Sequence, residues 1–425
     1  MKTKFLLLFF AFACVPAFGA DAVYRFDFTG GTPRKGYIAV DSRTVYSDAA
    51  GYGYDLQPAP ERGSRTPFFF SVRVPDGNYK VTVKLGSSTL SGETTVRAES
   101  RRLFVERQRT APGEFSKHSF IVNKRNTHIS DTERVRIKPR ERNKLNWDDK
   151  LTLEFNGPAP RVAEIIIEPT SKPITLFLCG NSTVVDQDNE PWGSWGQMIP
   201  RFFTDKVAVA NYAESGESAN TFLAARRLDK ALTQMKAGDW VFVEFGHNDE
   251  KQKGPGKGPW TSYYDSLKEY IVKTRAKGAN IVFVTPTQRR SFGEDGKIQD
   301  THGEYPLAMR KLAEEEGVPV IELNEMTRTL YEALGVEGST RAFVHYPANT
   351  YPGQTQALED NTHFNPYGAY QIAKCVLQGI KSQKLGLAKY IVKDFKGYDP
   401  AHPDMPSRFV WDLSPFTEIE KPDGN

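Results

Sequence analysis

From Ile174 onward, short apolar runs alternate with longer stretches of helical spacing, and this rhythm constrains the fold more than any other feature. Apolar runs between helical stretches are typical of parallel strands that helices cover on both faces. We therefore expect a three-layer α/β fold with a parallel sheet. Its strands are predicted at 174–179, 207–211, 239–245, 280–285 and 318–323, and its helices at 219–236, 261–277, 304–316, 325–334 and 366–383.

Residues 21–170 have a different pattern, with many short alternating segments and little helical periodicity. The segment 70–74 leads through Pro75-Asp76-Gly77-Asn78 into 79–85, which is a strong hairpin signal. We expect a β-sandwich at 21–170. A chain of 425 residues also exceeds what one hydrophobic core usually organises, so a second domain at 173–390 is expected. The tail, 391–425, is rich in Pro and Asp, and its position is not predicted.

Three polar or small residues follow three of the predicted strands. They are Ser182, Gly216 and Asn248. The carboxyl ends of parallel strands meet at one edge of the sheet, where open α/β folds gather their ligand site. Ser182, on a strand-to-helix turn, is placed as a nucleophile would be. Each residue alone has an ordinary explanation, as a helix N-cap, a turn glycine or a strand-end cap.

A carboxylate and an imidazole come late in the chain, at Asp360 and His363. The order of a serine first and an Asp/His pair last is compatible with a hydrolytic triad, because such triads are defined by roles rather than by position. Asn365-Pro366 indicates a helix start, so His363 is expected in a loop before that helix. A single Asp-x-x-His motif arises often by chance, but four such features in the right order are much rarer.

Together these segments resemble the four sequence blocks of the SGNH (GDSL-type) hydrolases. The resemblance covers about 173–385, and its four blocks are Gly180-Asn181-Ser182, Gly216, Gly246-His247-Asn248-Asp249 and Asp360-x-x-His363. Within that family, Gly180-Asn181-Ser182-Thr183-Val184 followed by Trp195-Gly196-Gln197 resembles the rhamnogalacturonan acetylesterase branch.

The resemblance implies a flavodoxin-like SGNH fold and a role for each matching residue. Ser182 would be the nucleophile, His363 the base and Asp360 its orienting partner. The backbone N–H groups of Ser182 and Gly216, with the Asn248 amide, would form the oxyanion hole. One position departs from the family, which usually has Asp where this chain has Asn181. Because that Asp is not the triad acid, the triad is unaffected, whereas a charge-dependent role at Asn181 is in doubt.

Other residues near these motifs have alternative interpretations. His247 adjoins Asn248 and could be read as the base, but we assign that role to His363. Trp192 is interpreted as a substrate-binding residue, since aromatic faces stack on sugar rings, and a core position is the alternative. Trp195 is expected to be structural.

The first twenty residues have the form of a secretory signal. Lys2 and Lys4 precede an apolar stretch that is too short to span a bilayer, and cleavage is expected after Gly19 or Ala20. We therefore expect export to the periplasm or the exterior. Cys14 offers lipid anchoring as an alternative, although Phe12 is bulky for that signal. Cys179 and Cys375 remain after cleavage and are expected to be buried free thiols, with pairing as the alternative.

The net charge of the chain is small, at +4, but residues 101–150 carry fourteen Lys/Arg and seven Asp/Glu. This excess is either a solvated face of the β domain or a surface that attracts an acidic polymer. No nucleic-acid-binding module or metal-ligand spacing is recognisable, and no other apolar run is long enough to span a membrane. The expected chemistry needs no cofactor.

The resemblance predicts a secreted carbohydrate esterase that removes acetyl groups from plant cell-wall polysaccharide, most simply acetylated rhamnogalacturonan or pectin. The β domain resembles, in pattern only, galactose-binding-like modules, and it would bind carbohydrate or brace the enzyme. The alternatives are an esterase on another acylated glycan such as xylan, a lipid esterase, and an inactive polysaccharide-binding protein. The intact Ser182, Asp360 and His363 argue against the last.

Overall fold

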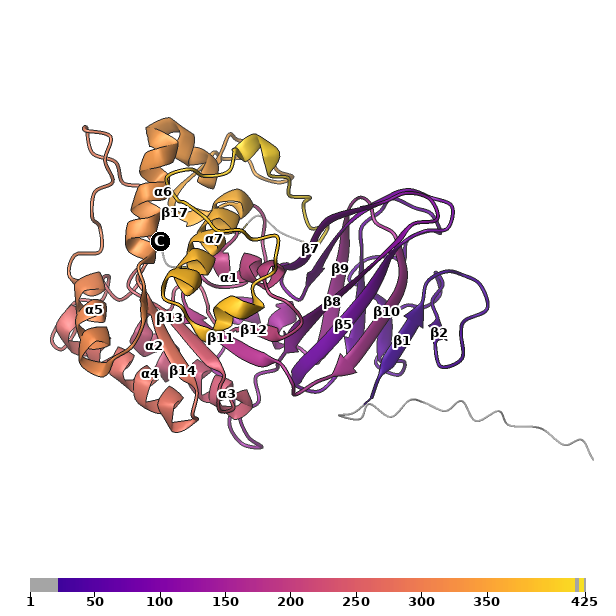
Figure 1. The fold of residues 1–425 in the computed structure, drawn as a ribbon, viewed down its shortest axis with the longest axis horizontal. Coiled ribbons are helices and arrows are strands. Elements are labelled where there is room, and N and C mark those ends of the chain that lie inside the picture. Colours follow the sequence, from indigo (N-terminus) through magenta and orange to yellow (C-terminus); the bar gives the residue numbers. More distant parts are fainter. Residues whose placement is uncertain (1–21, 417–419, 424–425) are drawn as a thin grey trace, which may run out of the picture.

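The structure is a computed structural model that describes residues 22–416 and 420–423. The predicted signal sequence and Cys14 lie outside the described residues. Figure 1 shows an α/β half built from the later part of the chain beside a β-rich half built from the earlier part. In the described part of the chain, no helix is long and apolar enough to cross a membrane.

The α/β half contains the predicted parallel strands. They pair in the order β15-β14-β13-β11-β12, the flavodoxin-like arrangement in which the first strand lies inside the sheet. Their apolar side chains are almost all buried, as expected for strands covered on both faces. The strands are β11 (Ile174–Gly180), β12 (Val207–Asn211), β13 (Trp240–Glu244), β14 (Asn280–Val284) and β15 (Val320–Ile321).

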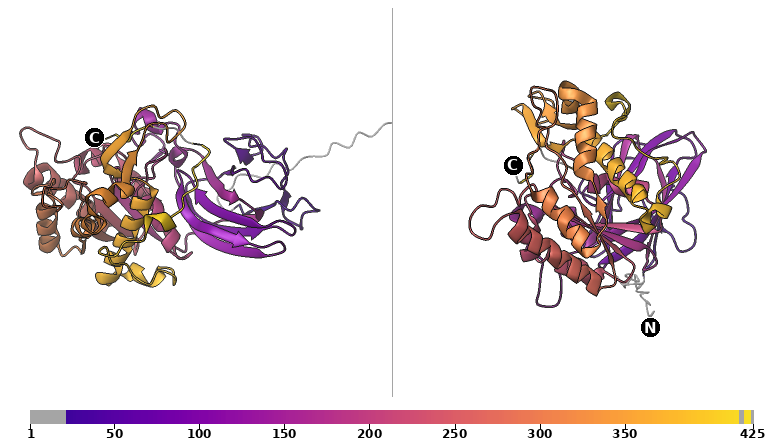
Figure 2. Two further views of the ribbon diagram at one scale, coloured as in Figure 1. Left: turned by 90° about the horizontal axis from the view of Figure 1, so that it is seen from above. Right: turned by 60° about the vertical axis from the view of Figure 1, so that its left-hand side comes forward.

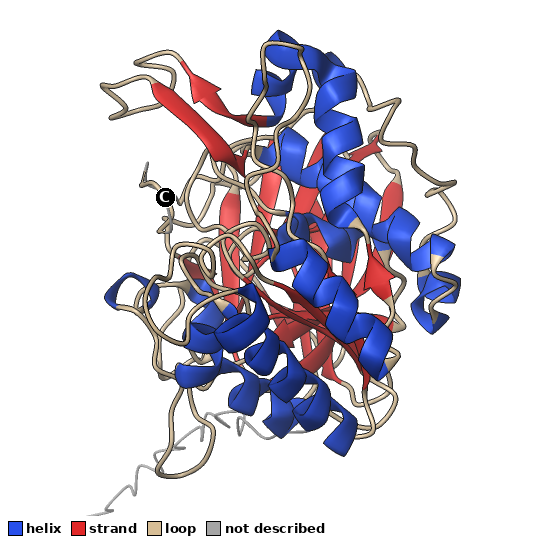
Figure 3. Cartoon of the chain, turned by 90° about the vertical axis from the view of Figure 1, so that its left-hand side faces the viewer, coloured by secondary structure: helices blue, strands red, loops and turns tan. Residues whose placement is uncertain are grey.

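Helices pack on both faces of this sheet, as Figure 3 shows, and they define two separate cores. One core includes α1 (Trp195–Met198), α6 (Leu323–Gly338) and α7 (Pro366–Ser382), and the other includes α2 (Ala219–Ala224), α3 (Arg227–Gln234), α4 (Tyr264–Ala276) and α5 (Tyr305–Glu316). Cys375 belongs to the first core and Cys179 to the second. Both thiols are buried and free, as predicted, because the sheet separates them.

In the β-rich half, two sheets share one apolar core, to which Phe70, Val83 and Phe155 contribute. One sheet has the order β3-β4-β9-β6-β7, with β3 (Tyr52–Asp55), β4 (Phe68–Arg73), β9 (Lys150–Ala159), β6 (Gly92–Ala98) and β7 (Arg102–Thr110). The facing strands have the order β8-β5-β10-β1-β2, with β8 (Phe115–Lys124), β5 (Gly77–Gly86), β10 (Val162–Pro169), β1 (Tyr24–Asp27) and β2 (Ile38–Ala39).

The two halves are joined by a continuous sheet, which the sequence did not predict. β8 pairs in parallel with β12 at Val122 and Val209, so ten strands form one mixed sheet across the molecule. The parallel sheet expected for the α/β half is therefore part of a larger mixed one (Figure 1). Strands β8 and β12 are far apart in the chain, and no local sequence pattern predicts that these two strands will pair at the edges of their sheets.

A short hairpin, β16 (Phe343–Tyr346) with β17 (Leu358–Phe364), lies before α7. His363 is thus the penultimate residue of a strand rather than part of the predicted loop. Pairing with β16 keeps the backbone in an extended conformation up to Phe364. The next residue, Asn365, caps α7, because its side chain accepts the N–H of Gly368.

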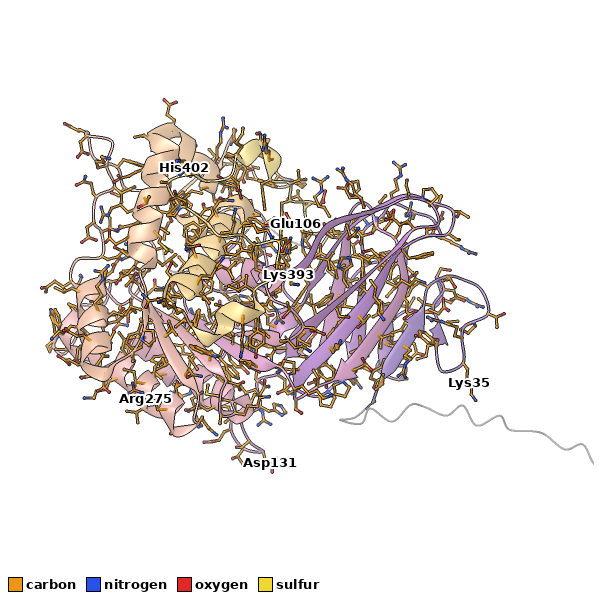
Figure 4. All side chains as sticks on the ribbon, in the orientation of Figure 1. Lys35, Glu106, Asp131, Arg275, Lys393 and His402 are labelled. Carbon is orange, nitrogen blue, oxygen red and sulfur yellow. The ribbon has the colours of Figure 1, made fainter. Side chains whose placement is uncertain are left out.

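Side chains from both halves meet along their junction. Glu106 of β7, labelled in Figure 4, accepts hydrogen bonds from Tyr370 Oη (2.9 Å) and Arg201 Nε (3.2 Å) of the α/β half. The tail, which the sequence left unplaced, also crosses the junction. Trp411 Nε1 donates to Glu190, and the Trp411 ring lies under the guanidinium of Arg97 at 3.7 Å. The last described residue, Asp423, lies beside Gly216 of the α/β half, near the end marked C in Figures 1 and 2.

Candidate active site

Ser182, His363 and Asp360 form a continuous hydrogen-bonded chain. Ser182 Oγ lies 2.8 Å from His363 Nε2, and His363 Nδ1 lies 2.8 Å from Asp360 Oδ2. All three side chains are nearly excluded from solvent, with Ser182 only 3% exposed and His363 only 1%. The structure therefore brings together the three residues that the sequence predicted as nucleophile, base and orienting acid.

Asp360 and His363 are held by their own backbone as well as by each other. The other oxygen of Asp360, Oδ1, accepts the N–H groups of Thr362 and His363, each at 2.9 Å. Burial alone would raise the pKa of Asp360, but the hydrogen bonds and charge of His363 hold that pKa well below its usual value. Asp360 is therefore ionised and able to stabilise a charged imidazole.

Ser182 lies on a turn that β11 enters from the sheet, and Asn181 shapes that turn. The backbone oxygen of Asn181 accepts the N–H groups of Val184 and Val185, both at 3.0 Å. Its side-chain Oδ1 accepts the N–H of Thr183 at 3.0 Å and lies 2.8 Å from the Thr183 hydroxyl. An uncharged amide oxygen performs these tasks as well as a carboxylate would, so the Asn at this position is compatible with the turn.

Glu244, at the end of β13, holds the same turn in place through hydrogen bonds. Its carboxyl oxygens lie 2.8 Å from the Thr183 hydroxyl and 2.6 Å from Trp195 Nε1. Burial raises the pKa of Glu244 to about 7, although these two contacts oppose the rise. Glu244 was not predicted from the sequence, where its one signal is an acidic residue that ends an otherwise apolar strand. Trp195 is structural, as predicted.

The sequence predicted an oxyanion hole from the backbone N–H groups of Ser182 and Gly216 and the side-chain amide of Asn248. Among the described residues, the backbone N–H groups of Ser182 and Gly216 donate to no protein acceptor. Asn248 Nδ2 donates to the backbone oxygen of Glu217 at 2.9 Å. An amide NH₂ carries two hydrogens, so this bond orients the group and leaves one hydrogen to donate.

The loop that carries Gly216 requires a glycine. Its φ of +78° is in the left-handed region, and a Cβ at this position would lie 2.8 Å from Lys138 Nζ. Asp249 connects the turn that carries Asn248 to the start of α2, which follows the Gly216 loop. It accepts the N–H of Ala219, the first residue of α2, at 2.8 Å and that of Gly246 at 3.0 Å. Asp249 therefore positions Asn248, a role that the motif alone did not reveal.

Buried cations of the β-rich half hold the loop that follows Ser182. Arg101 pairs with Glu190 at 2.6 Å and donates to the backbone oxygens of Gln187 and Trp192 at 2.8 and 2.7 Å. Arg102 pairs with Asp186 at 3.2 Å, with both side chains fully buried. These arginines belong to the basic stretch 101–150, so part of that excess lies in an interior contact rather than on a solvated face.

Lys144 joins the Ser182 loop to the Gly216 loop. Its ammonium group lies 2.8 Å from Asp188 on the first and 3.2 Å from Glu214 on the second. Burial would lower the pKa of Lys144, but the two carboxylates raise it. Burial likewise opposes ionisation of Glu214, whose pKa the charges of Lys144 and Arg227 lower to about 2. Sequence reasoning missed this bridge, because a lysine in a loop looks like a surface residue.

The prediction that Trp192 binds substrate is contradicted by its position. Trp192 is only 1% exposed, so no ring face is open to stack on a sugar, and Arg101 donates to its backbone oxygen. His247 is 2% exposed and packs edge-on against His302, so His363 rather than His247 contacts Ser182. Within the described ranges, no three His, Cys, Asp or Glu side chains are grouped so as to hold a metal ion.

The chain is similar to several known proteins. The sequence pattern of the GDSL-like lipase/acylhydrolase family matches residues 178–370. Rhamnogalacturonan acetylesterase RhgT of Bacillus subtilis (strain 168) is 43% identical over 223 residues, 52% of this chain and 95% of that protein. The uncharacterized esterase YxiM of the same strain is 25% identical over 387 residues, 85% of this chain and 91% of that protein. A crystal structure of the YxiM protein covers 86% of this chain and 99% of its own, with 24% identity and a TM-score of 0.47.

The chain therefore belongs to the GDSL-like lipase/acylhydrolase family, the SGNH hydrolases, as its sequence blocks predicted. Within that family it belongs to the rhamnogalacturonan acetylesterase-like branch. It is a carboxylic ester hydrolase.

Proposed function

We propose that this chain is an exported acetylesterase that removes acetyl groups from plant cell-wall polysaccharide, with acetylated rhamnogalacturonan as its substrate. The observation that carries the proposal is the contact of 2.8 Å between Ser182 Oγ and His363 Nε2, with Asp360 behind the imidazole. The substrate is inferred from the relatives, since RhgT and a probable rhamnogalacturonan acetylesterase, YesY, are 43% and 34% identical to this chain.

In the proposed mechanism, His363 Nε2 takes the proton of Ser182 as its oxygen attacks the acetyl carbonyl. Asp360 fixes the imidazole through Nδ1 and stabilises its charged form. His363 then gives its proton to the departing sugar oxygen, which leaves an acetyl group on Ser182. Water attacks this ester with the same residues in the same roles, and acetate leaves.

The tetrahedral oxyanion is proposed to lie among the N–H of Ser182, the N–H of Gly216 and the amide of Asn248. Donors fixed before the reaction stabilise the charge without further rearrangement. The bond from Asn248 to Glu217 and the Asp249 contacts supply that fixation here.

We propose that residues 21–170 form a galactose-binding-like β-sandwich domain that braces an SGNH domain at 173–390, with 391–425 as a tail across both. The shared core of its two sheets supports the sandwich. The bracing role is supported by the buried pairs Arg101–Glu190 and Arg102–Asp186. Removal of a signal sequence at 1–20 and export follow from the sequence pattern alone.

The substrate proposal is tested by measuring acetate release from acetylated rhamnogalacturonan, acetylated xylan and acetylated mannan under the same conditions. The proposal expects the highest kcat/KM on rhamnogalacturonan. Preference for xylan or mannan, with hydrolysis intact, would contradict the substrate and leave the esterase chemistry standing.

A further inference from the structure

The described end of the tail lies against the loop that carries Gly216. Pro422 is buried, and the carboxylate of Asp423 lies 3.3 Å from Arg140 Nη1 and 3.7 Å from Lys138 Nζ. A Cβ built on Gly216 would be 3.0 Å from the Cβ of Asp423. The Asp423 side chain therefore lies directly beside the residue whose N–H is a proposed oxyanion donor.

Arg140 and Lys138 are placed differently from the bracing cations. Their side chains are 14% and 27% exposed, whereas those of Arg101 and Arg102 are 3% and 0% exposed. Among the described residues, Asp423 is the one ion-pair partner of Arg140, and the buried Nε of Arg140 has no hydrogen-bond partner. Arg140 is therefore a largely desolvated guanidinium whose pairing depends on a flanking carboxylate from the tail.

Acidic side chains surround Lys138 and Arg140. Lys138 lies 3.4 Å from Glu217 and donates to the backbone oxygen of Ser215, which fixes its position beside Gly216. Asp188 and Glu214, the acidic side chains of the adjoining loops, are both engaged by Lys144. Burial opposes ionisation of Arg140, but the charges of Glu214, Asp423, Glu420 and Asp188 raise its pKa. Arg140 is therefore charged, and it can exchange Asp423, the acid within ion-pair distance, for an external carboxylate.

We propose that Arg140 and Lys138 form a subsite for the carboxylate of a uronate residue in the polysaccharide, and that Asp423 occupies this subsite in the absence of substrate. The inference rests on the proposed function, since it concerns how the same site recognises its substrate. An arginine beside a carboxylate is a strong, planar recognition element, and a guanidinium presents two N–H groups to it. The subsite places a uronate next to the ester under attack.

The same geometry gives Asp423 a competing role. Its side chain is 49% exposed, so the contact with Arg140 is screened and can be exchanged for a substrate carboxylate. A neutral acetylated sugar gains nothing from this exchange. The esterase should therefore favour acidic chains through KM, and removal of the Asp423 charge should strengthen that preference.

The test compares Arg140→Gln and Asp423→Asn with the unchanged protein and with Arg142→Gln, an exposed arginine on the same segment. Kinetics are measured on acetylated rhamnogalacturonan oligosaccharides and on neutral acetylated xylo-oligosaccharides. Arg140→Gln should raise the KM for the acidic substrate about tenfold or more, the effect of one charged hydrogen bond, while the neutral KM changes much less. Asp423→Asn should lower the acidic KM, and Arg142→Gln should change neither.

Equal changes on the acidic and neutral substrates in Arg140→Gln would overturn the subsite. A variant that folds poorly is replaced by Arg140→Lys, which retains the charge and should retain most of the preference. Asp423→Asn changes an exposed side chain, so it should fold normally and it tests the competing role of the tail independently of Arg140. An unchanged acidic KM in that variant would overturn the competing role of the tail.

Failure of the proposed function is distinguished by a binding measurement with sodium galacturonate as the probe. Calorimetry should show tighter binding to Asp423→Asn and weaker binding to Arg140→Gln than to the unchanged protein, whichever polysaccharide the enzyme hydrolyses. If rhamnogalacturonan is not deacetylated but this order holds, the substrate proposal fails and the subsite stands. If galacturonate binds all three proteins equally, the subsite is wrong even when rhamnogalacturonan is the substrate.

Discussion

Arg101 of the β-rich half and Glu190 of the loop after Ser182 form an ion pair of 2.6 Å, with side chains only 3% and 1% exposed. The charges of Arg101 and Arg97 lower the pKa of Glu190 against the effect of burial, so this carboxylate is ionised inside the protein. An ionised group at such a depth is tolerated because its partner and its hydrogen bonds compensate for lost hydration. The earlier half of the chain is thus part of the structure that shapes the active site.

Replacement of Arg101 by Met should destabilise the protein by about 3–5 kcal/mol, because it removes the cation that is paired with the buried Glu190 carboxylate. Urea unfolding followed by tryptophan fluorescence measures this change. Arg109→Met is the matched control, since the Arg109 side chain is 77% exposed in its pair with Glu93, and its loss should cost less than about 1 kcal/mol. A loss of similar size in both variants would contradict the bracing role.

Glu244 should make stability fall as pH rises through the window between its two pKa values. In the unfolded chain it releases its proton near pH 4.5, whereas the folded protein keeps that proton until about pH 7. Rising pH therefore favours unfolding across this window by roughly 3 kcal/mol, and the effect levels off above it.

Glu244→Gln tests this account, because an amide can accept from Trp195 and donate to Thr183 without titrating. Chemical denaturation from pH 4.5 to 8 should give a flatter stability profile for the variant than for the unchanged protein. Parallel profiles would show that Glu244 ionises in the folded protein much as it does in the unfolded chain.

Asn248→Ala should reduce transition-state stabilisation by about 2.7–4 kcal/mol, the usual effect of removing one oxyanion donor. The loss should appear in kcat more than in KM, because the donated hydrogen bond strengthens as the oxyanion forms. Steady-state kinetics on p-nitrophenyl acetate separate the two constants. A change confined to KM would make Asn248 a substrate contact instead.

Gly216→Ala should lower kcat and stability together. The φ of +78° strains any residue with a Cβ, and that atom would also meet Lys138 Nζ at 2.8 Å. Lys138 Nζ ends a flexible side chain and can move aside, but the strained backbone must change its φ, which displaces the N–H proposed to bind the oxyanion. Gly238→Ala has a similar φ of +86° with open space around it and provides the control for strain without the contact. Equal losses of kcat in the two variants would contradict a local role for Gly216.

The parts of the site that the sequence predicted are those fixed by local pattern. Ser182 and Asn248 each follow a short apolar strand, and the edge of a parallel sheet brings such positions together whatever the rest of the chain does. Trp192 was misassigned because local sequence does not report whether an aromatic ring faces inward. Lys144 and Arg101 were missed for a similar reason, since a charge in a polar segment looks solvated until its distant acidic partner is known.

The pairing of β8 with β12 could not be predicted either. It depends on Val122 and Val209, which are ordinary apolar residues in two strands that contact only through the arrangement of the whole molecule. The same limit applies to Asp423, which reaches Arg140 from the far end of the chain. Long-range contacts of this kind leave no periodic signal, because each partner satisfies the local pattern of its own segment.

The central claim, that Ser182 is the nucleophile of a polysaccharide acetylesterase, is tested most directly by acetate release from acetylated rhamnogalacturonan. The unchanged protein should release acetate, and Ser182→Ala should reduce kcat on the order of 10⁴-fold or more. Its unfolding transition should remain close to that of the unchanged protein, because a single hydroxyl oxygen is removed. Acetate release by Ser182→Ala at a rate close to that of the unchanged protein would contradict the account.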